Sequence, residues 1–411
     1  MDRRVAEADP GDVEHGVGRA GRQGADPDPQ VTSARHARIL PDAGPPGWDA
    51  RAVPNPAPPA DPIPVVWSPA TRLHVPRHEV WLGVPTPGTE VPERVDEILG
   101  ALGDHDLHEA VAHGDELLRV VHHPGLLEFL ETAAAAWARE GYEEVVGQDR
   151  VVPYFFETPA LVAGMEPTPP AALHARTGQY CYDTMTLVGP GTWEAARAAV
   201  DAALTAVDLV VGGQRAAYAL CRPPGHHVTP LGYGGSCYLN NAAVAAEALR
   251  AAGHERVAVI DVDAHHGNGT QAVFWERPDV LYGSLHVDPA AGWFPHLFGH
   301  ASETGAGAGA GATRNRPLPE GTGDGPWVEA VADLADWAAA GGATALVVSL
   351  GVDAAADDPE SPLRVTADGY ERAGRALGGL GLPSVMVQEG GYHLPTLGGL
   401  VAAYLRGHGD A

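Results

Sequence analysis

The stretch that decides the fold is RVAVIDVDAHHG, residues 256 to 267. After Arg256 it runs through four apolar residues, Val257 to Ile260, and continues at once into aspartates and histidines. An apolar run of this length predicts a buried strand, and the polar residues mark where that strand ends. Those polar residues fit either an ordinary solvated turn or the rim of a metal site.

Other segments along the chain repeat this form. Buried strands that finish in polar residues are also predicted at residues 216–222, 280–288, 344–353 and 383–392. Helices are predicted at residues 91–102, 125–140, 192–213, 240–253, 326–340, 366–378 and 395–406. Apolar strands that alternate with helices are typical of a parallel sheet covered on both faces. We therefore predict an α/β fold, a single three-layer domain with a central, mostly parallel sheet flanked by helices.

The first part of the chain has a different composition. Residues 1–62 are rich in Pro, Gly and Asp and contain few apolar groups, so we predict a disordered tail. The remaining residues, 63–411, are predicted to form the folded domain. With 411 residues, 45% of them hydrophobic, the chain can bury a large core.

The net charge of −27 argues against a nucleic-acid partner, because the chain cannot neutralise a phosphate backbone. It is compatible with attraction of cationic substrates and equally with simple solubility. No apolar run reaches the roughly 18 residues of a membrane helix. The start, MDRRVAEADPGD, lacks the apolar stretch of a signal peptide, and Cys181, Cys221 and Cys237 are expected to be reduced thiols. A cytoplasmic protein is therefore expected.

Three polar residues at strand ends suit a metal ion. Asp263 and His265 are two residues apart, so in an extended chain they point to the same side. Asp353 ends another predicted strand, and the carboxyl ends of parallel strands meet at one edge of the sheet. Two aspartates and a histidine with an open position suit one Zn²⁺, with Fe²⁺ or Co²⁺ as alternatives.

A second motif, RPPGHH, holds His226 and His227 on a backbone stiffened by two prolines. Adjacent imidazoles suit proton transfer better than shared binding of one ion. Asp261 is the expected partner of His226, and Asn268 that of His227. The alternative is a pair of packed surface histidines.

A third motif, QEGGY, places Tyr392 after two glycines at a predicted strand end. Glycines allow other groups to approach the backbone closely. The tyrosine could then donate a hydrogen bond to a developing oxyanion.

Taken together, these motifs resemble the zinc-dependent histone deacetylase family, including its bacterial acetylpolyamine amidohydrolase members. The resemblance runs from about Val65 to Leu405. It rests on VPERVDEIL, YALCRPPGHH, CYLNNAAVAA, IDVDAHHGNGTQ, SLHVDP, SLGVD with DDP behind it, and QEGGYH. It implies a single catalytic α/β domain, over residues 63–411, of the fold shared with arginase.

The resemblance also implies roles for individual residues. The zinc ligands would be Asp263, His265 and Asp353. The catalytic residues would be His226, His227 as the principal general base, Tyr392, and the histidine partners Asp261 and Asn268. A structural potassium ion would be held by Asp261, Asp263, His265, Ser284 and Leu285.

The sequence departs from the family at the expected substrate tunnel. The family usually has an aromatic residue where this chain has Ser236, so one wall of the tunnel is less apolar. Gly235 and Phe294 are the remaining expected contacts. Residues 151–170 correspond to an insertion that narrows the entrance and builds a dimer in polyamine-processing relatives. A homodimer is therefore an expected option, and Glu157 or Glu166 is a candidate contact for a substrate ammonium.

These observations predict a metal-dependent amidohydrolase acting on small N-acyl amines, with acetylpolyamines as the first choice. A protein acetyl-lysine deacetylase and an amidohydrolase of specialised metabolism are the alternatives. A ureohydrolase with two manganese ions is disfavoured, because Gly267 stands where those enzymes carry the second aspartate of DAHxD. A non-catalytic binding protein is disfavoured, because no expected ligand, base or tyrosine is lost.

Overall fold

The computed structural model of the chain describes residues 62–103 and 105–411. The predicted disordered tail, residues 1–62, lies outside the described residues apart from Pro62. In the described part, no helix is long and apolar enough to cross a membrane.

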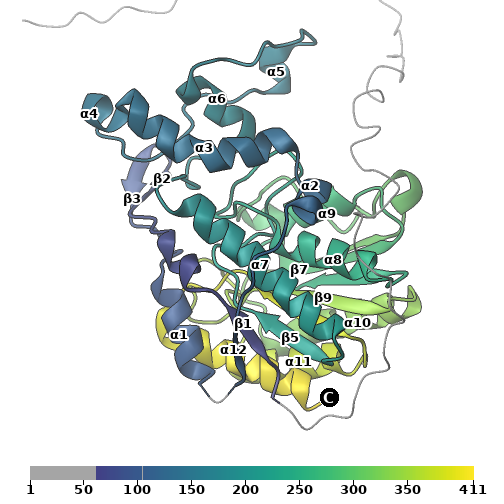
Figure 1. The fold of residues 1–411 in the computed structure, drawn as a ribbon. Coiled ribbons are helices and arrows are strands. Elements are labelled where there is room, and N and C mark those ends of the chain that lie inside the picture. Colours follow the sequence, from purple (N-terminus) through teal and green to yellow (C-terminus); the bar gives the residue numbers. More distant parts are fainter. Residues whose placement is uncertain (1–61, 104) are drawn as a thin grey trace, which may run out of the picture. The chain divides into compact units, whose positions relative to one another are not determined.

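An eight-stranded sheet forms the centre of the fold (Figure 1). Its strand order is β4-β1-β5-β10-β9-β6-β7-β8, and every neighbouring pair is parallel. The strands are β1 (Val65–Trp67), β4 (Leu107–Glu109), β5 (Ala216–Ala219), β6 (Val257–Asp261), β7 (Val280–Val287), β8 (Thr313–Leu318), β9 (Ala345–Leu350) and β10 (Ser384–Gln388). The predicted α/β fold with a central parallel sheet is confirmed.

Helices cover both faces of this sheet, because alternate side chains of each strand enter opposite cores. On β6, Val257 and Val259 belong to one core, and Ala258 and Ile260 to the other. The first core contains residues of α2 (Glu116–Val121), α3 (Pro124–Glu140), α7 (Thr192–Val211), α8 (Asn241–Ala251) and α9 (Asn268–Phe274). The second contains residues of α1 (Glu93–Ala101), α10 (Asp324–Ala340), α11 (Ala367–Gly378) and α12 (Leu394–Gly409).

Smaller elements lie outside these layers. They are the antiparallel pair β2 (Glu79–Trp81) and β3 (Val84–Thr86), the short helices α4 (Tyr142–Val146), α5 (Pro159–Val162) and α6 (Leu173–Tyr180), and the 3₁₀ turns η1 (Pro69–Leu73), η2 (Pro289–Ala291) and η3 (Gly307–Gly309). Strand β2 lies beside the segment after α6, because the Val80 amide donates to the Thr184 carbonyl oxygen at 3.2 Å.

The strand order places the polar strand ends together. The strands β5, β10, β9, β6 and β7 are consecutive neighbours in the sheet and all run in the same direction. Their carboxyl ends therefore share one edge, which is where ligands bind in α/β sheets.

Candidate active site

Two aspartates and a histidine converge beyond the ends of β6 and β9. The Nδ1 atom of His265 lies 3.2 Å from Asp263 Oδ1 and 3.1 Å from Asp353 Oδ2. Both aspartates are buried. Each of the three residues can offer one ligand atom, and these atoms lie within 4.8 Å of one another.

The charges of this group favour a bound cation. Burial and the neighbouring charge of Asp263 raise the pKa of Asp353 to about 7. Burial would lower the pKa of His265, but hydrogen bonds to Asp263 and Asp353 raise it well above 6.5. The group thus retains protons that a divalent cation would replace.

Two glycines keep room beside these carboxylates. A Cβ atom on Gly390 would overlap the carboxylates of Asp353 and Asp263, and one on Gly351 would overlap that of Asp263. The donor set, its charge and this open backbone all fit a metal ion.

A second group, His226, Cys237 and Glu389, has ligand atoms equally close together. Its Glu389 carboxylate already accepts hydrogen bonds from the backbone amides of Gly225 (2.6 Å) and His226 (3.1 Å) and from the Ser349 hydroxyl (3.2 Å). Burial also raises the pKa of Cys237 well above 9, so the thiol stays protonated. We therefore favour the group of Asp263, His265 and Asp353 as the metal site.

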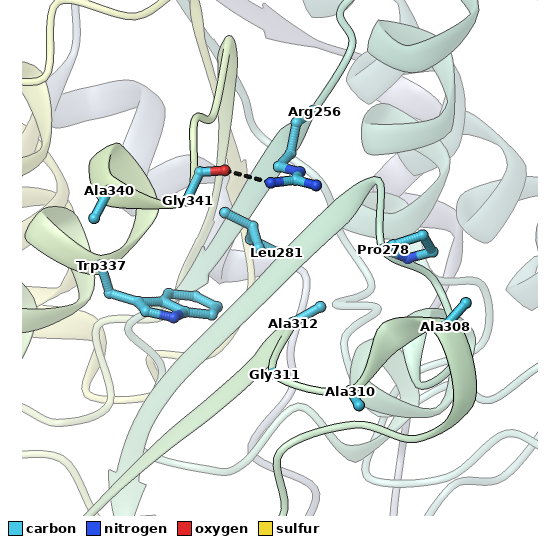
Figure 2. A pocket seen from close by; sticks show the side chains of 10 residues that line it. All are labelled: Arg256, Pro278, Leu281, Ala308, Ala310, Gly311, Ala312, Trp337, Ala340 and Gly341. Atoms are coloured by element: carbon cyan, nitrogen blue, oxygen red, sulfur yellow. Dashed lines mark hydrogen bonds between the residues drawn. The ribbon is translucent and has the colours of Figure 1, made fainter.

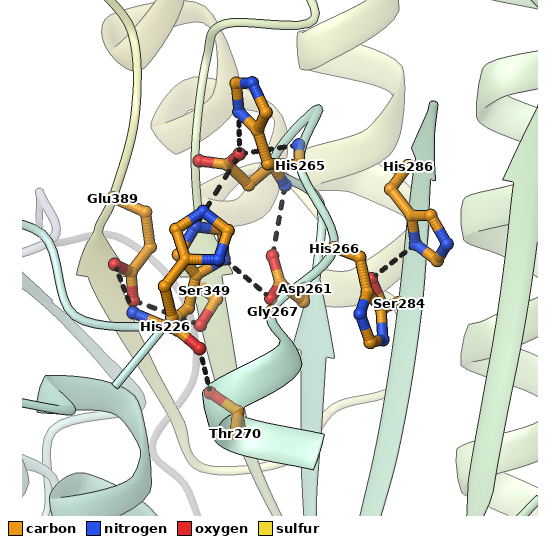
Figure 3. A network of polar contacts seen from close by, with 12 residues as sticks. His226, Asp261, His265, His266, Gly267, Thr270, Ser284, His286, Ser349 and Glu389 are labelled. Atoms are coloured by element: carbon orange, nitrogen blue, oxygen red, sulfur yellow. Dashed lines mark hydrogen bonds and ion pairs between the residues drawn. The ribbon is translucent and has the colours of Figure 1, made fainter. Parts of the chain in front are cut away.

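The two adjacent histidines have different partners, and Figure 3 shows that of His226, the Asp261 carboxylate. His226 Nδ1 lies 3.0 Å from Asp261 Oδ2, whereas His227 Nδ1 lies 2.8 Å from Asn268 Oδ1. These are the pairs predicted from the sequence. An acceptor at Nδ1 holds the ring proton there and leaves Nε2 free to accept a proton.

The two histidines also differ in the direction of their pKa shifts. Burial would lower the pKa of His226, but the charges of Asp263 and Asp261 raise it to about 10. Burial, together with the charges of His226 and His265, lowers the pKa of His227 well below 6.5. At neutral pH His227 is therefore neutral, which a general base requires.

Tyr392 is held by one contact to its backbone and one to its ring. Its amide donates to Asp358 Oδ2 at 2.7 Å, and the Arg94 guanidinium carbon lies 4.9 Å from its ring centroid. Burial raises the pKa of Tyr392 well above 10, so the phenol keeps its proton and can donate it in a hydrogen bond.

Two aromatic rings lie at the approach to His227. The Phe294 ring makes an edge contact with the His227 ring, with centroids 4.7 Å apart. Tyr182 is nearly parallel to Phe294, with a centroid distance of 6.3 Å, and its hydroxyl donates to the His227 carbonyl oxygen at 2.8 Å. Gly235 adopts φ +59° beside them, where a Cβ atom would overlap both His227 and Phe294.

The remaining predicted contacts are placed as follows. Asp261 and Ser284 face each other in register on β6 and β7, and Leu285 is fully buried. Potassium binding there stays a prediction. Glu157 accepts a hydrogen bond from Gln179 of α6 at 3.1 Å, and its contact with a substrate also stays a prediction.

The sequence did not single out three polar residues of the site, Tyr182, Asp358 and Glu389, or the partly buried Glu79 of β2. Asp358 and Glu389 carried a signal, because Asp358 follows the predicted strand 344–353 and Glu389 lies in the polar end of the predicted strand 383–392. Glu79 and Tyr182 carried none, since they lie in segments without a predicted strand.

A separate pocket of about 430 Å³ lies at the opposite edge of the sheet (Figure 2). Its lining includes Arg256, Leu281, Trp337 and the end of the GAGAGAGA loop at residues 305–312. Arg256 precedes β6, whereas Asp261 ends it, so the pocket takes no part in the site above. The guanidinium of Arg256 donates to the Gly341 carbonyl oxygen at 2.6 Å.

Residues 88–408 match the family of the Histone deacetylase domain. The chain belongs to the histone deacetylase family. It is 42% identical over 347 residues to the acetylpolyamine amidohydrolase of Mycoplana ramosa, a match that covers 84% of this chain and 98% of that protein. Acetylpolyamine amidohydrolase 1 of Pseudomonas aeruginosa is 39% identical, with coverages of 84% and 99%.

A solved structure agrees with these relatives. The crystal structure of acetylpolyamine aminohydrolase from Burkholderia pseudomallei has a TM-score of 0.79 and 39% identity. The match covers 84% of this chain and 98% of that one. The resemblance inferred from the sequence motifs is confirmed: the chain is a deacetylase-type amidohydrolase, and its family is metal-dependent.

Proposed function

We propose that this deacetylase family member hydrolyses small N-acyl amines, with acetylpolyamines as its substrates. The main supporting observation is the group of Asp263, His265 and Asp353, which lies beside His227. His227 is neutral and hydrogen-bonded to Asn268. The printed names of the relatives support acetylpolyamines as the substrate class.

Acidic groups near the approach to the site also favour a cationic substrate. Burial and the charge of Glu360 raise the pKa of Glu79 to about 7. A hydrogen bond from the Thr89 backbone lowers this pKa, and the charge of Asp183 raises it. A substrate ammonium would relieve this crowding of negative charge. Asp183 contacts the tunnel residue Gly235, whose amide donates to Asp183 Oδ2 at 2.6 Å.

Asp263, His265 and Asp353 would hold one Zn²⁺, Fe²⁺ or Co²⁺, which would supply Lewis acidity for the acyl carbonyl and the attacking water. His227 would accept the water proton at Nε2 and pass it to the leaving amine. His226, kept cationic beside Asp261, would offset negative charge next to the reacting carbonyl. Tyr392 would donate its hydroxyl hydrogen to the developing oxyanion.

The direct test is amine release by purified protein loaded with zinc or with iron. Acetylputrescine and an acetyl-lysine peptide are compared, with His227→Ala as the control. We expect turnover of acetylputrescine that His227→Ala abolishes. Equal turnover in His227→Ala would contradict the role of the base, and no turnover of either substrate would contradict the substrate class.

Protein acetyl-lysine is the second candidate substrate, because Ser236 leaves one wall of the tunnel open. Faster turnover of the peptide than of acetylputrescine would favour it. An amide of specialised metabolism remains the third candidate.

Further proposals concern the molecule around the site. We propose residues 63–411 as the catalytic domain. A structural K⁺ is proposed at the group formed by Asp261, Asp263, His265, Ser284 and Leu285. A cytoplasmic location is proposed because the three cysteines are free and buried. Tyr154, Leu161 and Met165 are 72%, 50% and 66% exposed in residues 151–170, which supports a homodimer through this segment.

A further inference from the structure

The buried carboxylate of Glu90 lies between the buried guanidinium groups of Arg94 and Arg222, outside the proposed metal site. Glu90 Oε1 accepts a hydrogen bond from Arg94 Nη1 at 2.8 Å and lies 2.9 Å from Arg222 Nε. All three residues are only 1% exposed. Among the described residues, no other carboxylate makes a salt bridge with Arg94 or with Arg222.

Glu90 therefore carries the compensating charge for both arginines. Burial alone would raise its pKa, but Arg222 and Arg94 outweigh burial and hold the pKa below its usual value. An unpaired buried charge is strongly unfavourable, so loss of this one carboxylate would destabilise both guanidinium groups in their present positions.

Arg94 holds the loop that carries Tyr392. Its Nε donates to the Gly391 carbonyl oxygen at 2.7 Å, and its Nη2 donates to the Glu389 carbonyl oxygen at 2.5 Å. The guanidinium also lies against the Tyr392 ring. Arg94 thus fixes the backbone on both sides of Gly390, immediately before the proposed oxyanion donor.

Arg222 holds the start of the loop that carries the two histidines. Its Nη1 donates to the Thr71 carbonyl oxygen at 2.7 Å, and its Nη2 donates to those of His74 (2.8 Å) and Glu90 (3.1 Å). Two prolines follow, and the Gly225 amide is bound by the Glu389 carboxylate, so little freedom remains between Arg222 and His226.

The two loops also touch each other directly. The Glu389 carboxylate accepts the amides of Gly225 and His226, so a shift of the Tyr392 loop would displace the histidine loop. Arg94 in turn binds the carbonyl oxygen of Glu389. The carboxylate of Glu90 is thereby connected to both loops, through one arginine to each.

We propose that Glu90 is a positioning residue that sets the general base and the oxyanion donor relative to each other through Arg94 and Arg222. The inference rests on the proposed amidohydrolase function. It predicts a loss in turnover rather than in substrate binding. Among the described residues, Glu90 makes polar contacts with Arg94, Arg222 and His74 and none with the expected tunnel residues, and its charge is the smallest of the influences on the pKa of Glu79.

The test compares Glu90→Gln and Glu90→Asp with wild type. Glutamine removes the charge. Aspartate keeps the charge but is one methylene shorter, so it cannot reach both guanidiniums. Because misplacement of a catalytic group by about 1 Å can cost 100-fold in rate, we expect kcat to fall by about 10- to 100-fold with KM nearly unchanged.

The control is Glu247→Gln, which removes a buried carboxylate 2.7 Å from Arg277, remote from both loops. We expect this control to lower the melting temperature and leave kcat unchanged. Hydrogen exchange followed by mass spectrometry gives a readout independent of activity. Both Glu90 variants should exchange faster in peptides that cover residues 222–228 and 388–393.

Two results would overturn the proposal: kcat of both Glu90 variants at the wild-type value, or faster exchange spread evenly over the molecule. If Glu90→Gln does not fold, Glu90→Asp decides. If wild type turns over no N-acyl amine, the proposed function fails, and the exchange pattern alone then supports or overturns the coupling.

Discussion

At the scale of single residues, two neighbouring histidines differ because their partners differ. His226 faces a carboxylate and is cationic, whereas His227 faces the neutral amide of Asn268 and is neutral. The carboxylates of Asp263 and Asp261 raise the pKa of His226, whereas burial and the charges of His226 and His265 lower that of His227. Neither the order of the residues nor their spacing alone could assign these charges, since they depend on burial and on the charged groups that the fold brings beside each ring.

Asn268→Asp tests this separation. A carboxylate at Nδ1 would stabilise the imidazolium and raise the pKa of His227, and a protonated His227 cannot act as a base. The acid limb of the kcat/KM profile should therefore move to higher pH, as measured from pH 4 to pH 9, a range that extends below 6.5 because the pKa of His227 is low in the wild type. Asn268→Ser is the neutral control, and an acid limb that coincides with wild type in Asn268→Asp would rule out His227 as the base.

Tyr392→Phe tests the oxyanion donor. The variant keeps the ring beside Arg94 and loses only the hydroxyl, so packing should be preserved. Loss of one oxyanion donor typically lowers kcat by about 10²- to 10³-fold, and we expect that effect here. The melting temperature should stay near the wild-type value. Wild-type kcat in this variant would remove Tyr392 from the mechanism.

Glu79→Gln tests the acidic approach. Removal of this carboxylate should raise KM for acetylputrescine, which carries an ammonium group, and leave kcat nearly unchanged. A neutral N-acetylated alkylamine is the matched substrate, and its KM should not respond. An equal rise of KM for both substrates would show that Glu79 acts on the shape of the site rather than on charge.

At the scale of elements, the apolar pattern predicted the five central strands and the seven long helices. It did not predict β1, β4 and β8, which lie toward the edges of the sheet. β1 and β4 have only three residues each, and the sequence of β8, TRNRPL, is too polar to resemble a buried strand. These strands form because the neighbouring strand offers hydrogen bonds, a partner that the local sequence does not reveal.

The C-terminal helix α12 shows how close packing of elements depends on glycine. A Cβ atom on Gly407 would overlap the Glu371 carbonyl oxygen of α11, whereas Gly399 of the same helix has open space beside it. Gly407→Ala should therefore lower the free energy of unfolding by about 1–3 kcal/mol, the usual cost of overpacking. Urea unfolding measures this change.

Gly399→Ala is the control within the same helix. It should stabilise the protein by up to about 1 kcal/mol, because alanine favours an exposed helical position. Neither variant should change kcat, since both positions are remote from the strand ends. A Gly407→Ala variant as stable as Gly399→Ala would disprove the tight packing of α11 on α12.

At the scale of the whole molecule, the site results from the order of the strands. The ligand candidates follow β6 and β9, which are neighbours in the sheet although β7, β8 and α10 separate them in sequence. The parallel direction of the strands made this meeting predictable. The link from Glu90 to Arg222 was not predictable, because no sequence pattern relates a loop before α1 to a loop after β5.

A metal that joins β6 to β9 should stabilise the whole domain. Removal of the ion by a chelator is expected to lower the melting temperature, because a ligand at 1,000 times its Kd adds about 4 kcal/mol to stability. Differential scanning fluorimetry with chelator, and after addition of zinc, measures this effect. Asp353→Asn should lose the response and Cys237→Ser should keep it. The reverse result would move the metal to the group of His226, Cys237 and Glu389, because only there does Cys237 offer a ligand atom.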